Sequence, residues 1–364
     1  MMSRVPPTRL VRAATTVRTT VQKLAARMVP PEVGVLELAS GFMATHAVYA
    51  ATRLRIPDTL VAGPLSPADV AARVGTHEDA THRLLRACAM WGVFSEEPDG
   101  RFALTPLADR LRTGTRDSMR AVVLMLGDPS YQRVWAELAT TVRTGEPGAE
   151  RALGRSIWEH LEHDAEFGDV FHAAMTRLSA LDWPAVSAVY DFTRFSRVVD
   201  LGGGHGQLLA LVLGAAPAAE GVLVERSSMA DGAARLLGEA GLGDRYRFEA
   251  GSFFDTVPPD GDLYLLRRVL HDYDDAQAAA ILTTLREHVR ERATLLVLDG
   301  VVPPGNTPDF SKALDLDMML FVGGRERTEP QWRALLADTG FRTTRIVPTV
   351  SPVSLIEAVP GRKP

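Results

Sequence analysis

Glycines gather in one loop, at a point where the chain leaves a short apolar segment. That segment, VVDL, ends at Asp200 and Leu201, and glycine occupies positions 202, 203, 204 and 206. Glycine lets the backbone turn tightly and lets a ligand approach without a Cβ in the way. Ligands of open α/β sheets bind beyond the carboxyl ends of the strands, at this kind of turn. The pattern therefore favours a ligand site here over a turn needed only for packing.

A carboxylate follows at the end of the next apolar segment. Glu225 lies nineteen residues past Gly206, where it can accept two hydrogen bonds from a ribose diol. The dinucleotide fingerprint would require glycine at position 207, which is Gln207, and no GK[ST] sequence follows. These features weigh against NAD and ATP. They are compatible with S-adenosylmethionine, which carries a ribose but no phosphates.

His271 is the candidate general base. It follows the fourth apolar segment of this region, inside the sequence HDYDD. We therefore expect it to project from the carboxyl end of a strand, on the same edge of the sheet as the glycine loop. A lone histidine is more often a surface or core residue, but this position favours proton transfer in catalysis.

These residues require a parallel sheet to position them. Short apolar segments alternate with segments of helical composition, which predicts a doubly wound α/β domain. Two further segments, 341–350 and 353–360, are separated only by Ser351 and Pro352, too few residues for a crossover helix, so we expect an antiparallel hairpin at the sheet edge. The alternating segments are 197–202, 221–226, 246–254, 262–270 and 293–302.

The N-terminal half has a different pattern. Residues 33–60 show helical periodicity with few charges, which predicts largely buried helices. Residues 65–92 read as two helices, and 93–106 alternate around Asp99 and Gly100 as a hairpin. Two helices and a hairpin form a winged helix-turn-helix. Residues 116–190 look helical throughout, mostly with core-facing apolar residues.

A winged helix binds DNA in some proteins and mediates dimerisation in others. Arg83 and Arg86 can meet phosphates, but Glu78 and Asp79 occupy the first turn of the second helix, where base-reading residues normally lie. Carboxylates at that position repel DNA. The sequence favours a structural or dimerising role over nucleic-acid binding.

Composition limits the class of protein. The chain has 364 residues, of which 46% are hydrophobic and 23% charged, and its net charge of −5 gives no reason to expect a nucleic-acid or anionic-membrane partner. One cysteine, Cys88, excludes an intramolecular disulfide and a multi-cysteine metal site. The longest mostly apolar stretch, 208–219, is shorter than the roughly 18 residues of a membrane span, so no membrane segment is expected.

Residues 1–31 are predicted to form a basic arm. No apolar segment of a secretory signal follows the basic residues, so we expect a cytoplasmic protein. The arm is interpreted either as a segment packing on a neighbouring subunit or as a helix for a membrane surface or another anionic partner. Its basic residues are Arg4, Arg9, Arg12, Arg18, Lys23 and Arg27.

Five motifs in register resemble one family. They are DLGGGHG at 200–206, Glu225, GSFFD at 251–255, LLRRVLHDYDD at 265–275 and GGRERTEPQW at 323–332. Their order and spacing are similar to those of S-adenosylmethionine-dependent O-methyltransferases, both the plant caffeate type and the actinomycete polyketide-tailoring enzymes, from about residue 32 onward.

With the arm at 1–31, which precedes the matching region, we expect a four-part chain. The resemblance implies a mainly α winged-helix dimerisation domain at 32–115, a helical linker and substrate lid at 116–190, and a Rossmann-like class I methyltransferase domain at 191–364. It implies a homodimer that transfers a methyl group from S-adenosylmethionine to a hydroxyl of a small aromatic or polyketide-like acceptor. The alternatives are a relative that performs hydroxylation or decarboxylation, or a ligand-sensing transcription regulator.

The resemblance also implies roles for cofactor-binding residues. Gly202 and its neighbours lie against the methionine part, Glu225 holds the ribose hydroxyls, and Ser252 and Phe253 flank the adenine. Ser252 stands where an aspartate is usual, and Arg267 where a lysine is common near the adenine ring. The predicted cofactor-binding residues are Asp200, Gly202, Gly204, Glu225, Gly251, Ser252, Phe253 and Arg267.

For catalysis, the resemblance makes His271 the base and places Asp299 and Glu326 beside it, with no metal. Asp299 is one methylene shorter than the family's usual glutamate, so its contact with His271 is expected to be long or water-mediated. Met175 and Asp317 match positions that line the acceptor pocket. Asp317 departs from the common asparagine, which indicates an acceptor with a donor or cationic group.

Overall fold

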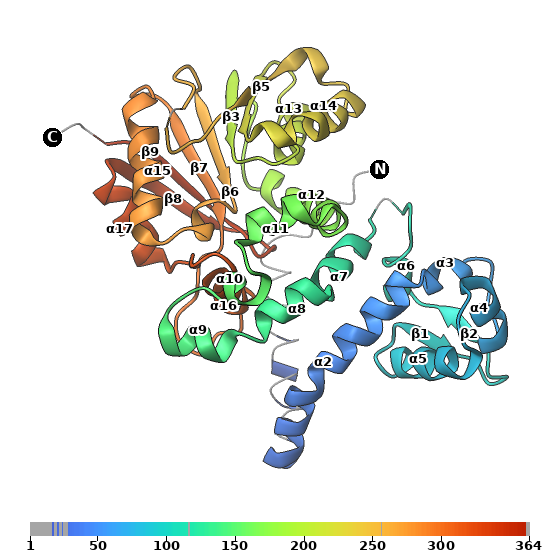
Figure 1. Ribbon diagram of the computed structural model, residues 1–364. Coiled ribbons are helices and arrows are strands. Elements are labelled where there is room, and N and C mark those ends of the chain that lie inside the picture. Colours follow the sequence, from blue (N-terminus) through green and yellow to red (C-terminus); the bar gives the residue numbers. More distant parts are fainter. Residues whose placement is uncertain are drawn as a thin grey trace. The chain divides into compact units, whose positions relative to one another are not determined.

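The computed structural model describes residues 28–115, 117–255 and 257–361, together with residues 17, 20, 21 and 24. The chain divides into two compact units (Figure 1). The helical unit comprises Thr20–Ala136 and Trp158–Leu178, and the sheet unit comprises Glu137–Ile157 and Ser179–Pro364. The basic residues of the predicted arm lie outside the described residues: Arg4, Arg9, Arg12, Arg18, Lys23 and Arg27.

The helical unit contains the predicted winged helix. Helix α4 (Pro67–Val74) begins after Ser66, whose hydroxyl oxygen accepts from the main-chain N–H of Asp69 at 3.1 Å, and it ends at Gly75. Helix α5 (Glu78–Met90) follows, and strands β1 (Phe94–Glu96) and β2 (Phe102–Leu104) pair as an antiparallel hairpin. Apolar side chains of all these elements share one buried core.

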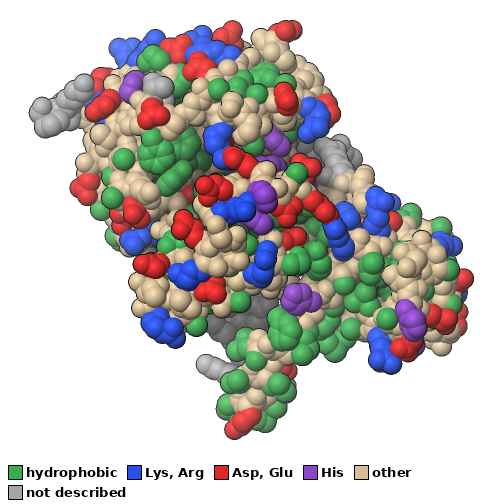
Figure 2. All heavy atoms as spheres, in the orientation of Figure 1, with side chains coloured by type: hydrophobic (Ala, Val, Ile, Leu, Met, Phe, Trp, Pro, Cys, Tyr) green, Lys and Arg blue, Asp and Glu red, His purple; other side chains and the backbone are tan. Residues whose placement is uncertain are grey.

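The long helix α2 (Pro31–Arg53) differs from the expectation of a largely buried segment, since only Ala51 and Thr52 are buried. Figure 2 shows hydrophobic side chains gathered along this helix, at the bottom of the view. By length and composition alone α2 could also cross a membrane, so the expectation that no segment is long and apolar enough is wrong for this helix. The exposed large hydrophobic residues of α2 are Val33, Val35, Leu36, Leu38, Phe42 and Met43.

The described part of the predicted helical region, residues 117–190, is helical apart from its two ends and short turns. Helix α12 (Ala165–Ser187) is the longest of this group and continues from the helical unit into the sheet unit. The other helices from this half of the chain are α3 (Ile56–Thr59), α6 (Pro106–Asp109), α7 (Arg120–Leu126), α8 (Pro129–Trp135), α9 (Leu138–Thr144), α10 (Ala149–Leu153) and α11 (Ile157–His163).

The sheet unit has the predicted topology. Among the described residues seven strands form one sheet in the order β5-β4-β3-β6-β7-β9-β8. The first five are parallel, and β9 runs antiparallel to both β7 and β8. The strands are β3 (Arg197–Leu201), β4 (Glu220–Glu225), β5 (Tyr246–Ala250), β6 (Leu263–Arg267), β7 (Thr294–Asp299), β8 (Phe341–Pro348) and β9 (Ser354–Pro360). Strand β5 ends at Ala250, earlier than the predicted segment 246–254.

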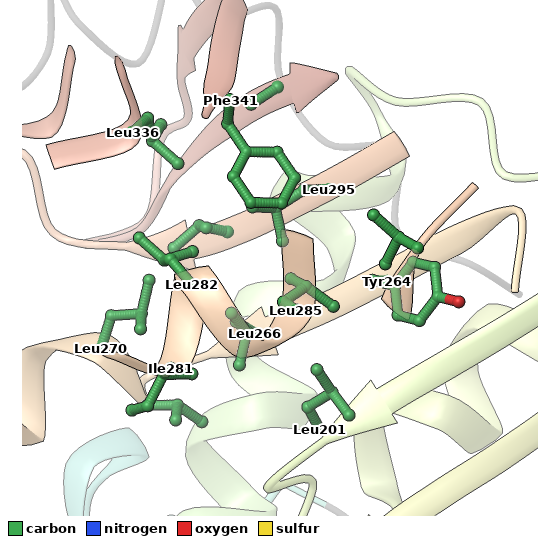
Figure 3. Close-up of a cluster of buried hydrophobic side chains, with 14 of the residues drawn as sticks. Leu201, Tyr264, Leu266, Leu270, Ile281, Leu282, Leu285, Leu295, Leu336 and Phe341 are labelled. Atoms are coloured by element: carbon green, nitrogen blue, oxygen red, sulfur yellow. The ribbon is translucent and has the colours of Figure 1, made fainter. Parts of the chain in front are cut away.

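Helices cover both faces of this sheet. Alternate residues of β3, such as Val199 and Val198, enter opposite cores, because successive side chains of a strand point to opposite faces. Helices α15 (Asp275–His288) and α17 (Glu329–Asp338) supply one core, drawn in Figure 3. Helices α13 (Gln207–Ala215) and α14 (Ala230–Glu239) supply the other. Helix α16 (Ser311–Phe321) precedes the segment that carries Glu326.

The buried carboxylate of Glu357 accepts hydrogen bonds both from the antiparallel edge of the sheet and from the segment that precedes β3. Glu357 of β9 accepts hydrogen bonds from the Tyr190 hydroxyl at 2.8 Å and from Arg194 at 2.6 Å. It also accepts from Thr344 at 2.6 Å and from Arg345 at 3.0 Å. Burial alone would raise the pKa of Glu357, but these hydrogen bonds lower it to about 2.

We expect Glu357→Gln to lower the free energy of unfolding at pH 7 by about 1–3 kcal/mol, because charge-assisted hydrogen bonds are lost at a buried site. A carboxylate whose folded-state pKa is about 2, against an ordinary 4.5, stabilises the fold above pH 4.5, and this contribution disappears as the pH falls toward 2. Urea denaturation at pH 7 and pH 3 measures both effects. Glu249→Gln, which removes an exposed ion pair with Arg247, is the matched control. A difference from wild type that does not shrink at pH 3 would contradict this account.

Candidate active site

The glycine loop follows β3 directly and adopts a backbone that favours glycine. Gly202 and Gly204 have φ values of 69° and 58°. A Cβ on Gly202 would lie 3.0 Å from Val269 and 3.2 Å from the ring of Phe253, whereas a Cβ on Gly204 would meet nothing within 4 Å. The loop therefore has a tightly packed side and a side open to a ligand.

Glu225 belongs to the same site, because β4 lies next to β3 in the sheet. Its Oε2 accepts a hydrogen bond from the main-chain N–H of Gly204 at 3.1 Å, and its Oε1 accepts from that of Arg226 at 2.9 Å. A carboxylate has about four lone-pair positions, so two bonds leave acceptor capacity for a diol.

Asp200 adds a buried negative group beneath this loop. Its side chain is buried, and neither carboxylate oxygen has a hydrogen-bond partner among the described residues. Burial raises the pKa of Asp200 to about 7. A Cβ on Gly203 would lie 2.4 Å from its Oδ2, so a side chain at this position would require the Asp200 carboxylate to move. An unpartnered buried acceptor beside an open loop fits a ligand that brings hydrogen-bond donors.

The predicted adenine-side residues also reach the loop. The main-chain N–H of Gly251 donates to the carbonyl oxygen of Glu225 at 3.1 Å, which holds the turn after β5 beside β4. Ser252 is half-buried, and its hydroxyl accepts from the N–H of Phe254 at 3.2 Å. The ring of Phe253 lies edge-on to that of Tyr273, with centroids 6.4 Å apart.

Arg267 has a strong partner that the sequence analysis missed. Its guanidinium donates to Oδ2 of Asp182 at 2.7 Å, and both side chains are almost fully buried. Arg268 lies 3.8 Å from the same oxygen. Burial lowers the pKa of Arg267. A charged residue between Leu181 and Trp183, within an otherwise apolar helical stretch, is the signal that could have indicated a buried ion pair.

His271 lies in a short 3-10 turn, Leu270–Asp272, just after β6. The ring is buried, and its Nδ1 lies 2.7 Å from Oε1 of Glu326 in a hydrogen bond. The same nitrogen lies 3.3 Å from Oδ1 of Asp299, at the end of β7, but neither oxygen of Asp299 has a hydrogen-bond partner among the described residues. The structure thus brings the three predicted catalytic side chains together.

The carboxylates of this group are held in low-dielectric surroundings. Burial raises the pKa of Glu326 to about 7, and Asp315 adds to the rise while Arg268 opposes it. Burial likewise raises the pKa of Asp299 to about 6, where the charge of His271 opposes the shift. The main-chain N–H of Glu326 donates to Asp315 at 2.8 Å, which ties this segment to α16.

Asp272 lies on the other side of the imidazole, and the sequence analysis treated it as structural. Its Oδ1 is 3.5 Å from Nε2 of His271. Burial raises the pKa of Asp272 to about 7, and the charge of His271 opposes the shift. The two ring nitrogens of His271 therefore face different groups: Nδ1 faces Glu326 and Asp299, and Nε2 faces Asp272.

The same three side chains have the composition of a metal site, since one ligand atom of each of His271, Asp299 and Glu326 lies within 4.8 Å of the others. Two ligands of one tetrahedral zinc ion would be separated by about 3.3 Å. The 2.7 Å between His271 Nδ1 and Glu326 Oε1 is the length of a hydrogen bond that shares a proton. The contact between His271 and Glu326 is therefore a hydrogen bond, and the absence of a metal stays a prediction.

The two predicted acceptor-site residues belong to different units. Asp317 is half-buried on α16 in the sheet unit, which also contains His271 and Glu326. Met175 is half-buried on α12 in the helical unit. Their contact with an acceptor stays a prediction.

Comparisons with known proteins identify the family of the chain. The model of the O-methyltransferase domain matches residues 135–342, and that of the O-methyltransferase dimerisation domain matches residues 36–114. The chain is 38% identical over 335 residues to a phenazine O-methyltransferase of Lysobacter antibioticus, covering 92% of this chain and 98% of that protein. It is 40% identical over 335 residues to the O-demethylpuromycin-O-methyltransferase of Streptomyces alboniger, covering 90% and 88%.

A solved structure and a further relative bear on ligands and activity. The O-methyltransferase from neocarzinostatin biosynthesis, in complex with S-adenosylmethionine and 2-hydroxy-5-methyl naphthoic acid, has a TM-score of 0.74 and 32% identity, covering 87% of this chain and 95% of that one. Aclacinomycin 10-hydroxylase of Streptomyces purpurascens is 35% identical over 312 residues, covering 81% of this chain and 80% of that protein. The expected fold and family are confirmed, and the chain belongs to the O-methyltransferase family.

Proposed function

We propose that this enzyme methylates a hydroxyl of a small aromatic or polyketide-like acceptor, with His271 as the general base. The donor is S-adenosylmethionine, the cofactor of the family, whose sulfonium supplies an electrophilic methyl group. The observation that carries the proposal is the buried contact between His271 and Glu326, at the same edge of the sheet as the glycine loop.

The cofactor would be held by groups on adjacent strand ends. Glu225 would accept hydrogen bonds from the ribose diol, and the unpartnered oxygens of Asp200 would accept from donors near the glycine loop. Gly202 and Gly204 would leave room for the methionine part, with Gly251 and Ser252 on the adenine side. Phe253 would supply an apolar ring there. Arg267, whose guanidinium is held by Asp182, would lie near the adenine ring in a fixed position.

The chemistry explains why a base is needed. A phenol has a pKa of about 10 and a neutral histidine about 6.5, so full proton transfer before attack is uphill by about 5 kcal/mol. A base that takes the proton while the oxygen–carbon bond forms avoids populating the free phenolate. With the proton on Nδ1 held by Glu326, Nε2 of His271 is the atom that receives the acceptor proton. Glu326 and Asp299 then stabilise the imidazolium.

The acceptor class is inferred from relatives and from two side chains. The relatives' names specify a phenazine and O-demethylpuromycin, and that of a 33% identical protein of Streptomyces carzinostaticus specifies 2,7-dihydroxy-5-methyl-1-naphthoate. All three contain aromatic rings. Asp317 on α16 and Met175 on α12 are proposed to contact the acceptor, and a carboxylate at position 317 favours an acceptor with a donor or cationic group. Screening phenolic acceptors for release of S-adenosylhomocysteine identifies the substrate.

A homodimer in the cytoplasm completes the proposal. The dimerisation-domain match covers most of α2, whose exposed apolar residues provide a surface that a second subunit would bury.

Two other functions are distinguishable. A hydroxylase related to aclacinomycin 10-hydroxylase would release an oxygenated product without S-adenosylhomocysteine. A transcription regulator would use α5 for DNA binding, but Asp79 in the first turn of α5 pairs with Arg83 at 2.9 Å and offsets its charge. A salt-dependent DNA shift without product would favour the regulator.

Replacing the base tests the mechanism. We expect His271→Ala to lower kcat by about 10²- to 10⁴-fold, because general-base catalysis is lost, while calorimetry shows unchanged binding of S-adenosylmethionine. His288→Ala is the matched control, since Nδ1 of His288 contacts a main-chain carbonyl of its own helix. Turnover by His271→Ala equal to that of wild type would refute the assignment.

Glu326 gives the site a pH dependence. Burial raises the pKa of Glu326 to about 7, so we expect acidification from pH 8 to pH 6 to protonate the carboxylate and to lower the rate. We expect Glu326→Gln to slow turnover about tenfold or more at pH 8 and to narrow the ratio between the rates at pH 8 and pH 6. The exposed Glu329→Gln, which loses only a contact with Arg333, should behave as wild type. Equal pH–rate profiles for Glu326→Gln and wild type would count against this role.

Glu225 is tested by binding alone. Glu225→Gln should lower the affinity for S-adenosylhomocysteine, measured by calorimetry, about tenfold or more, because the amide offers one acceptor oxygen and no charge. The exposed Glu239→Gln on α14 should leave affinity unchanged. Wild-type affinity in Glu225→Gln would remove Glu225 from the cofactor site.

A further inference from the structure

One buried side chain donates hydrogen bonds to the main chain at both ends of the turn that carries His271. Arg327 is 0% exposed. Its Nη1 donates to the carbonyl oxygen of Leu270 at 2.8 Å, and its Nη2 donates to that of Tyr273 at 3.0 Å. These two carbonyls flank His271 on either side, so one planar guanidinium spans the whole turn.

The guanidinium is itself held in place by groups from two other elements. Its Nε donates to Oδ1 of Asp275, the first residue of α15, at 2.9 Å. It also lies over the ring of Trp332 on α17, 5.3 Å from the centroid. The indole N–H of Trp332 donates to the carbonyl oxygen of Gly300 at 2.9 Å, directly after Asp299.

The main chain around Arg327 follows the same turn closely. The N–H of Arg325 donates to the carbonyl oxygen of His271 at 2.8 Å. A Cβ on Gly324 would lie only 2.0 Å from that oxygen, so the two segments touch without space for a side chain. The carbonyl oxygen of Arg327 accepts from the N–H of Val302 at 3.0 Å, beyond the end of β7. Segment 324–327 therefore contacts the chain near both His271 and Asp299.

A guanidinium is well suited to this position. A short 3-10 turn leaves carbonyl groups without partners in the turn, and burying them unpaired is unfavourable. Arginine presents several donors in a fixed plane, whereas lysine has one flexible ammonium and cannot span two carbonyls and a carboxylate with the same geometry. Catalytic groups need to be held within about 0.5 Å of their productive positions.

We propose that Arg327 is a positioning residue for the reaction: with Asp275 orienting its guanidinium, it fixes the turn 270–273 so that His271 meets Glu326 and Asp299. This inference rests on the proposed role of His271 as the base. Glu326 contacts the imidazole itself, whereas Arg327 acts through the main chain on either side of it.

The test compares two arginines that share one partner. Arg327→Lys keeps the charge but loses the planar fork. Arg325→Lys is the matched control, because the Arg325 side chain also pairs with Asp275, at 2.8 Å, but is exposed. For Arg327→Lys we expect kcat at least tenfold lower, KM and S-adenosylhomocysteine affinity within threefold of wild type, and a shifted pH–kcat profile. For Arg325→Lys we expect kcat within twofold.

Several outcomes would overturn the proposal. They are wild-type kcat in folded Arg327→Lys, a loss of kcat with an unchanged pH profile, and a loss that only follows weaker cofactor binding. If Arg327→Lys does not fold, we compare the kcat of Asp275→Asn, at the exposed start of α15, with that of Arg325→Gln. A kcat at least threefold lower in Asp275→Asn than in Arg325→Gln supports the proposal, and equal kcat values in the two variants overturn it. His271→Ala measured in parallel separates the two claims: wild-type turnover there would remove the base itself.

Discussion

A single hydrogen bond between residues far apart in the sequence organises the candidate active site. Nδ1 of His271 and Oε1 of Glu326 lie 2.7 Å apart, with both side chains buried. A buried carboxylate is unfavourable without a partner, and a buried histidine needs its tautomer fixed to act as a base. Each residue meets the other's requirement, and the surrounding segments have to be folded accurately for the contact to form.

The parallel sheet makes that arrangement possible. Strand β3 lies between β4 and β6, and β7 follows β6, so the carboxyl ends of four neighbouring strands meet at one edge. The glycine loop, Glu225, His271 and Asp299 each follow or end one of these strands. The groups proposed to bind the cofactor and to accept the proton are thereby combined on a rigid framework, while α16 and the segment after it add Asp317 and Glu326.

Much of this was predictable from local sequence patterns. Short apolar segments located the seven strands described in the large sheet, and a histidine or carboxylate at a strand end indicated the candidate site. Contacts between side chains far apart in the sequence were not predictable. They include the pairing of Arg267 with Asp182 and the hydrogen bonds from Arg327 to both ends of the turn that carries His271. The end of β5 at Ala250 was not predicted either. The apolar pattern of α2 was read as burial within one chain. Periodicity identifies an apolar face but does not say whether the same chain or a second subunit covers it.

In the proposed mechanism His271 carries its proton on Nδ1, and Nε2, which lies 3.5 Å from Asp272, accepts the proton of the acceptor hydroxyl. Nitrogen-15 NMR of histidine-labelled protein bound to S-adenosylhomocysteine, assigned with the His271→Ala variant, measures this directly. At pH 8 we expect the ring to be protonated at Nδ1, with that proton in the hydrogen bond to Glu326. A ring protonated at Nε2 would contradict it, because the nitrogen assigned to receive the acceptor proton would already be occupied.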